Sequence, residues 1–252
     1  MRNVEVTEKD LMVMYKIWRY RGYLSSWILE EKIWGDSETY PFKRLTKLRE
    51  RGYIDKRPVL NRQWRRATCW YLKRKGLQAL KEAKLVPEID LQNETKKWSR
   101  WRNDSHEAQW RRIWIADAAR TLEKECGWMW IPKYELMSEN QQAEDSSMLG
   151  GAFLNDDEVY GLIVVDSLPV NLYKESSFNA YTEGRLNAVI VLSLVKEVID
   201  EWGEPNPWEY VVPYKWGIDT IINDDQWKEA FRQYSTKHHH PNSEKTEKMV
   251  QV

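Results

Sequence analysis

Basic and acidic residues divide this chain into two parts of opposite charge. Residues 1–81 contain 20 Lys+Arg and 9 Asp+Glu, a net charge of +11, whereas residues 82–252 contain 19 Lys+Arg and 30 Asp+Glu, a net charge of −11. A chain of 252 residues can form one large domain or two ordinary ones. The charge division favours two, and the basic part has the electrostatic character of a module that binds nucleic acid.

Composition and cysteine spacing limit the class of protein. No segment approaches the ~20 consecutive apolar residues that a transmembrane helix needs, and the chain starts with MRNVEVTEKD rather than with an apolar signal region. We therefore expect a cytoplasmic protein with no membrane partner. Cys69 and Cys126 are too few and too far apart for a zinc site. We expect reduced thiols, no metal and no cofactor.

The basic part begins with two predicted helices. Thr7 and Asp10 have the spacing of a capping box, and an apolar stripe at helical spacing follows, which predicts a helix over residues 8–20. Gly22 ends this helix. The serine pair at 25–26 then caps a short second helix over residues 27–33.

A third predicted helix, Glu38–Arg51, carries the candidate binding face. Its apolar residues Phe42, Leu45 and Leu48 fall on one side and are expected to pack on the first two helices. The other side carries an aromatic residue and three cations, which we expect to be exposed: Tyr40, Lys43, Arg44 and Lys47. Such side chains can contact guanine edges or phosphates in the major groove. A charged helix face that meets only solvent is the alternative.

A basic hairpin is predicted after the third helix. Gly52 suits the left-handed residue that stops the helix, a strand begins at residues 53–54, and a second strand covers residues 68–72. The tip between the strands contains three arginines that could reach phosphates or a minor groove: Arg62, Arg65 and Arg66. A closing helix starts at Lys75.

The order of these segments resembles that of winged helix-turn-helix proteins over residues 7–82. The stretches LRERGYIDKR and WYLKRKGLQAL carry the resemblance, together with their order and separation. The resemblance implies that the third helix lies in the major groove of double-stranded DNA and that the hairpin contacts the flanking backbone. A winged helix that is used only for protein contacts is the alternative.

The acidic part is predicted to be a mixed α/β domain, so that the whole chain is α/β, or α+β overall. Residues 83–104 are polar and contain Pro87, which indicates a linker. The tryptophans at 98 and 101 either dock this linker or, with the neighbouring cations, extend the DNA footprint. Residues 105–234 form the domain itself, which serves dimerisation or partner binding, and residues 235–252 form a disordered tail.

Within the acidic domain, one long helix is expected to precede a series of strands. The helix opens at His106 and runs to about Glu125, and Gly127 ends it. The strands and the final helix are predicted at residues 128–132, 151–154, 159–165 and 187–192 (strands), 194–202 (helix) and 211–216 (strand or loop).

The layout of the whole chain resembles the replication-relaxation family, which occurs on plasmids and conjugative elements of Gram-positive bacteria. A predicted winged helix and a linker are followed by a helix opening at His106, and then by a W-x-x-x-x-E-L pattern at Trp130 and Glu135-Leu136. The resemblance implies a role in plasmid replication or in DNA processing for mobilisation. It also implies that the back domain is similar to a restriction-endonuclease-like fold.

The residues of such a nuclease centre are not in place. Those folds hold Mg²⁺ with an Asp on one strand and an (Asp/Glu)-x-Lys motif on the next. Here residues 150–153 read Gly-Gly-Ala-Phe, and residues 165–168 read Val-Asp-Ser-Leu, with Leu in the Lys position. We therefore expect a degenerate fold without catalytic residues, and a protein that is not an enzyme.

The sequence favours one function and leaves two alternatives open. The favoured function is a sequence-specific DNA-binding protein of a plasmid, phage or mobile element, which acts as a homodimer at an origin, transfer site or promoter. Its acidic domain would recruit a replication, relaxase or segregation protein. The alternatives are a Mg²⁺-dependent nickase or nuclease and a transcriptional regulator that senses a ligand.

Overall fold

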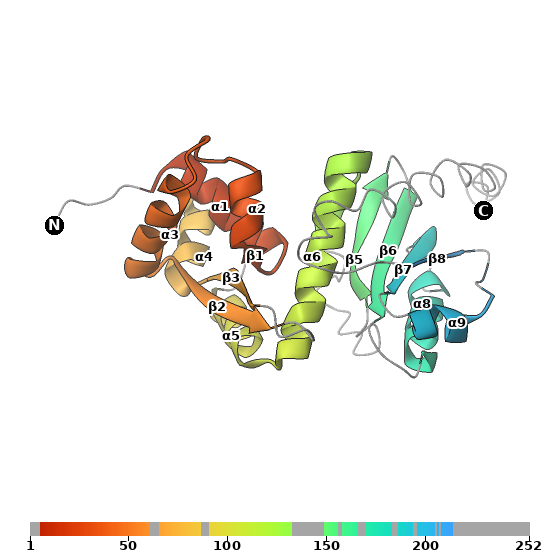
Figure 1. The fold of residues 1–252 in the computed structure, drawn as a ribbon. Coiled ribbons are helices and arrows are strands. Elements are labelled where there is room, and N and C mark those ends of the chain that lie inside the picture. Colours follow the sequence, from red (N-terminus) through yellow and green to blue (C-terminus); the bar gives the residue numbers. More distant parts are fainter. Residues whose placement is uncertain are drawn as a thin grey trace, which may run out of the picture. The chain divides into compact units, whose positions relative to one another are not determined.

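The chain folds as two compact units, residues 1–118 and 119–252, in this computed structural model. The structure describes residues 6–60, 66–86, 91–132, 149–155, 158–165, 170–182, 186–193, 196–204, 206 and 208–213. Each unit combines helices with one β-sheet (Figure 1), so the chain is α/β overall, as predicted. No helix in these ranges is long and apolar enough to cross a membrane.

The first unit starts with helix α1, Glu8–Arg19, whose N-terminus is closed by the predicted capping box. Thr7 Oγ1 accepts a hydrogen bond of 3.3 Å from the N–H of Asp10, and the Asp10 carboxylate accepts one of 2.8 Å from the N–H of Thr7. These two bonds satisfy donors that a helix end would otherwise leave unpaired. The buried stripe of α1, which includes Met14 and Trp18, packs against the rest of the unit.

Strand β1 (Tyr23–Leu24) and helix α2 (Ser25–Glu30) follow α1 directly. The predicted serine cap is wrong, because Leu24 occupies the N-cap position of α2 and no side chain caps it. The Ser25 hydroxyl instead accepts a hydrogen bond of 2.9 Å from Trp70 Nε1, which links α2 to a strand 45 residues away. Helix α3 (Tyr40–Glu50) comes next, and Gly52, two residues after its end, has a φ of 77°, which confirms the predicted left-handed stop.

Two strands and a helix complete the small sheet of the first unit. Strands β2 (Ile54–Leu60) and β3 (Arg66–Leu72) form an antiparallel hairpin, and β1 pairs antiparallel with β3, giving the order β1-β3-β2. Helix α4 (Arg74–Glu82) packs next to the start of β2. A β-carbon at Gly76 would overlap the backbone carbonyl of Tyr53, so only glycine allows this close approach.

The segment predicted to be a linker contains a helix that belongs to the first unit. Helix α5 (Leu91–Asn103) packs on α4, and the rings of Trp98 and Trp101 are buried. Trp101 lies 5.5 Å from the ring of Tyr71, and the guanidinium of Arg21 lies 5.7 Å from the centre of the Trp98 ring. The two tryptophans are three residues apart and share one helix face. The interpretation in which the tryptophans dock this segment is confirmed. The segment contains a helix that the sequence did not predict, because the residues around the tryptophans are mostly polar.

Helix α6 (His106–Cys126) runs across the boundary between the units, and the second unit is built on a five-stranded mixed sheet. The strand order is β4-β5-β6-β7-β8, antiparallel from β4 to β6 and parallel from β6 to β8. The four predicted strands, and the segment predicted as strand or loop, are strands within about three residues of their expected positions: β4 (Met129–Pro132), β5 (Leu149–Asn155), β6 (Glu158–Val165), β7 (Ala188–Ser193) and β8 (Glu209–Pro213).

Two helices make the crossovers that the parallel strands require. Helix α8 (Asn171–Thr182) connects β6 to β7, and α9 (Lys196–Trp202) connects β7 to β8. Side chains from both helices join one face of the sheet in a single core that includes Tyr173 and Trp202. Helix α8 was not predicted, because its sequence NLYKESSFNAYT is rich in residues of modest helix propensity. Its buried side depends on Tyr173 and Ser177, one turn apart.

Candidate nucleic-acid interface

The local sequence explains where α3 begins and which side of it is buried. Pro41 occupies the first turn, where a missing N–H costs nothing, and the Ser37 hydroxyl accepts a hydrogen bond of 3.2 Å from the N–H of Tyr40. The buried stripe is Pro41, Arg44, Leu45 and Leu48, at the i, i+3, i+4, i+7 spacing of one helix face.

Two of the predicted positions on α3 are therefore exchanged. Leu45 and Leu48 are buried, as expected. Phe42, expected in the core, is 44% exposed, whereas Arg44, expected on the exposed face, is only 9% exposed. The prediction for Arg44 is wrong because the apolar pattern of one helix does not reveal a charged partner elsewhere in the chain.

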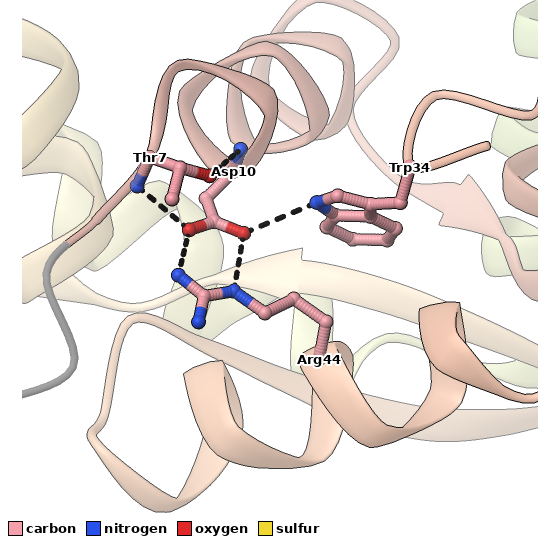
Figure 2. Close-up of polar contacts among 4 residues, drawn as sticks. All are labelled: Thr7, Asp10, Trp34 and Arg44. Carbon is pink, nitrogen blue, oxygen red and sulfur yellow. Dashed lines mark hydrogen bonds and ion pairs between the residues drawn. The ribbon is translucent and has the colours of Figure 1, made fainter.

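That partner is Asp10 of α1, at the centre of a buried network (Figure 2). The Asp10 carboxylate is fully buried and accepts bonds from both Nε and Nη2 of Arg44, the Nε bond being 2.7 Å long. It also accepts the N–H of Thr7 at 2.8 Å and the Trp34 indole N–H at 3.2 Å. Four donors thus occupy the acceptor sites of one carboxylate. The network joins the start of α1, the segment before α3 and α3 itself.

The network explains how a carboxylate stays ionised in the core. Burial alone raises the pKa of Asp10, but the hydrogen bond from Arg44 and those from Thr7 outweigh burial and hold the pKa below its usual value of 3.8. The hydrogen bond to Asp10 raises the pKa of Arg44 in return. Each charge therefore keeps the other ionised, which is the condition for burying both.

This pair makes the stability of the first unit sensitive to acid. Because the pKa of Asp10 is lower in the folded chain than in the unfolded chain, its stabilisation is complete above the ordinary value of 3.8 and is lost as the pH falls through the lower folded value. We expect the difference in free energy of unfolding between wild type and Asp10→Asn to shrink from about pH 7 to about pH 3. Urea unfolding across this range measures it. A constant difference would contradict the assignment.

The outward side of α3 combines cations with apolar groups. A shallow hollow of about 450 Å³ lies over it and is lined by Tyr40, Phe42, Lys43, Arg44, Thr46, Lys47 and Glu50. Tyr40, Lys43 and Lys47 are exposed, as predicted. Neither lysine has an acidic partner among the described residues, whereas Arg49 pairs with Asp55 through a contact of 3.1 Å. Phe42 was missed as a surface residue because a Phe at helical spacing from two leucines is typical of a core position. Thr46 was not among the predicted contact residues.

The predicted wing arginines lie at the end of the hairpin. Arg62 and Arg65 fall outside the described residues, and Arg66 is the first residue of β3, paired with Leu60 in register. The strands that support the tip pair antiparallel, and the Lys56 ammonium lies 5.9 Å from the centre of the ring of Trp70, its cross-strand partner. The structure therefore describes the base of the hairpin and the position of Arg66 in the strand.

Helix α5 adds a second group of cations to the first unit. Lys96, Lys97 and Arg100 are exposed, and Lys97 contacts the buried Glu94 carboxylate at 3.0 Å. Arg21 pairs with the same carboxylate at 2.7 Å. Burial raises the pKa of Glu94, but these two cations, Arg21 first, outweigh it and lower the pKa. Arg21 and Glu94 therefore tie α5 to the end of α1.

Among the described residues of the second unit, the strand positions considered for a nuclease centre carry no acidic residue. Leu149, at the start of β5, pairs with Ile163, and Gly151 pairs with Leu162 near the end of β6. Within the described ranges, no group of three or more His, Cys, Asp or Glu residues is placed to hold a metal ion. Asp156, Asp157, Asp166 and the histidines at 238–240 lie outside the described residues, as does the predicted tail at 235–252.

Comparison with known proteins finds no family, no curated protein and no solved structure that matches this chain. The candidate interface is therefore defined by its own residues. It consists of the outward side of α3, held in place from behind by the network of Asp10 and Arg44.

Proposed function

We propose that this protein binds double-stranded DNA sequence-specifically, with α3 as the recognition helix of a winged helix-turn-helix module. One observation carries the proposal: Lys43 and Lys47 project from α3 and have no acidic partner in the part of the chain that the structure describes, while the opposite side of the same helix is anchored by a buried ion pair. A rigid helix that presents uncompensated cations suits the major groove of DNA.

The order of elements in the first unit supports this module. Helix, short strand, two helices, a hairpin and a closing helix follow one another from α1 to α4, and the short strand pairs with the hairpin. In such modules the second helix of the helix-turn-helix enters the major groove, and the hairpin reaches the flanking backbone. Arg62, Arg65 and Arg66 are the hairpin residues proposed to contact phosphates. Arg44 is withdrawn from the proposed contacts because it is buried against Asp10.

For the second unit we propose an assembly role, as a homodimer or as a platform for a replication, relaxase or segregation protein. The order α6-β4-β5-β6-α8-β7 resembles the core of restriction-endonuclease-like folds. The apolar pairs at the start of β5 and the end of β6 favour a non-catalytic use of that core. The acidic character of this part of the chain disfavours its lying along DNA.

The proposed site of action is an origin, transfer site or promoter of a plasmid, phage or mobile element. Capture of fragmented host and plasmid DNA by the full-length protein at ~150 mM salt, followed by sequencing, tests this, because weak non-specific binding is suppressed at that salt concentration. We expect one locus with repeated sequences to be enriched, and its position distinguishes the three roles. Uniform recovery of all fragments, with affinity that vanishes at higher salt, would overturn sequence-specific binding.

A further inference from the structure

Phe42 is an exposed aromatic residue in the first turn of the proposed recognition helix. Its side chain is 44% exposed, beside Tyr40 at 47%, and both line the hollow over α3. The residues that pack α3 into the unit are on the opposite side of the helix. A large part of Phe42 is therefore open to solvent and available to a ligand that occupies the hollow.

Thr46 extends the apolar character of this surface by one turn. Its hydroxyl donates a hydrogen bond of 2.8 Å to the backbone carbonyl of Phe42, so the hydrogen of that hydroxyl is already used. Residues four positions apart lie on the same side of a helix. The Phe42 ring and Thr46 thus form a small, mainly apolar area in a hollow that Lys43, Lys47 and Glu50 also line.

Apart from its two lysines, α3 offers no unpaired side chain of the kinds that usually read a base with two hydrogen bonds. Arg44 is held by Asp10, and Arg49 is paired with Asp55. The helix sequence YPFKRLTKLRE contains no Asn or Gln, the residues that read adenine in this way. The two lysines and the apolar area are therefore the main groups through which α3 could contact bases. The apolar feature that a major groove presents is the 5-methyl group of thymine.

We propose that Phe42 is a specificity-determining residue that contacts the 5-methyl group of a thymine in the DNA site. This inference rests on the proposed function, because it requires α3 to lie in the major groove. Lys43 and Lys47 then contact the phosphates or guanines beside that thymine, and Thr46 contacts the same base pair or its neighbour. The DNA site of this protein therefore contains at least one thymine whose methyl group contributes to affinity.

The test compares thymine with deoxyuridine, which lacks only the methyl group. The preferred site is first selected from random duplex DNA with the full-length protein, and each thymine is then replaced singly before affinities are measured by fluorescence anisotropy. We expect one replacement to weaken wild-type binding about fourfold, the value of one buried methyl group. The same replacement is expected to change binding by Phe42→Ala less than about twofold.

The controls separate this inference from the proposed function. Phe178→Ala removes another exposed Phe, 55% exposed on α8 in the second unit, and is expected to keep the full sensitivity to deoxyuridine. Equal sensitivity in wild type and Phe42→Ala, or a selected site without thymine, would overturn the role of Phe42 while leaving DNA binding intact. A change in oligomeric state on Phe42→Ala with unchanged thymine preference would likewise overturn it. Failure to select any site would overturn the proposed function itself.

Discussion

Replacing Asp10 with alanine is expected to lower the free energy of unfolding of the first unit by about 3–5 kcal/mol. The reason is that the Arg44 guanidinium would remain buried without its carboxylate, and the N–H groups of Thr7 and Trp34 would lose their acceptor. Urea unfolding of the full chain gives the magnitude. Hydrogen exchange in α1 and α3 shows whether the loss is confined to the first unit.

A double-mutant cycle distinguishes the pair from the separate side chains. Arg44→Ala is expected to cost less than Asp10→Ala, because Asp10 keeps the donors of Thr7 and Trp34. The double variant is expected to cost less than the sum of the single ones, since no unpaired charge is left in the core. Asp36→Ala, which breaks an exposed ion pair with Lys32, is the control and should leave unfolding unchanged. Additive losses at Asp10 and Arg44 would contradict the coupling.

Replacing Lys43 and Lys47 together with alanine is expected to reduce affinity for the selected DNA site about tenfold or more, without a change in unfolding. Both side chains are exposed, so folding does not depend on them, and each removed phosphate contact lowers the slope of log affinity against log salt by about 1. Titrations at several salt concentrations should therefore show a slope smaller by about 2.

The matched control for this variant is an exposed lysine in the second unit. Lys124→Ala, near the end of α6, is expected to bind DNA with wild-type affinity and slope. Wild-type binding by the Lys43 and Lys47 variant would mean that α3 is not the contact surface. The hairpin arginines and the cations of α5 would then be the candidate DNA contacts.

Most of the elements were predictable because their signals are local. The capping box of Thr7 and Asp10 places the start of α1, and Gly52 places the end of α3, since each depends on residues within one turn. The strands other than β1 were found for the same reason, because alternating or continuous apolar runs between turn residues mark them. Strand β1 was missed because it has only two residues and forms by pairing with β3. Helix α8 was missed because its residues have modest helix propensity and it forms as the crossover between two parallel strands.

The two-part charge division, the α/β class and the positions of most helices and strands follow from the order of residues along the chain. Which side of α3 meets solvent does not, because the burial of Arg44 depends on Asp10, 34 residues earlier in the chain. Tertiary contacts also assign α5 to the first unit, because Trp98 packs on Arg21, Trp101 packs on Tyr71 of β3, and Trp101 lies beside Gly22. In each case the energy comes from a contact between residues far apart in sequence, which no local pattern records.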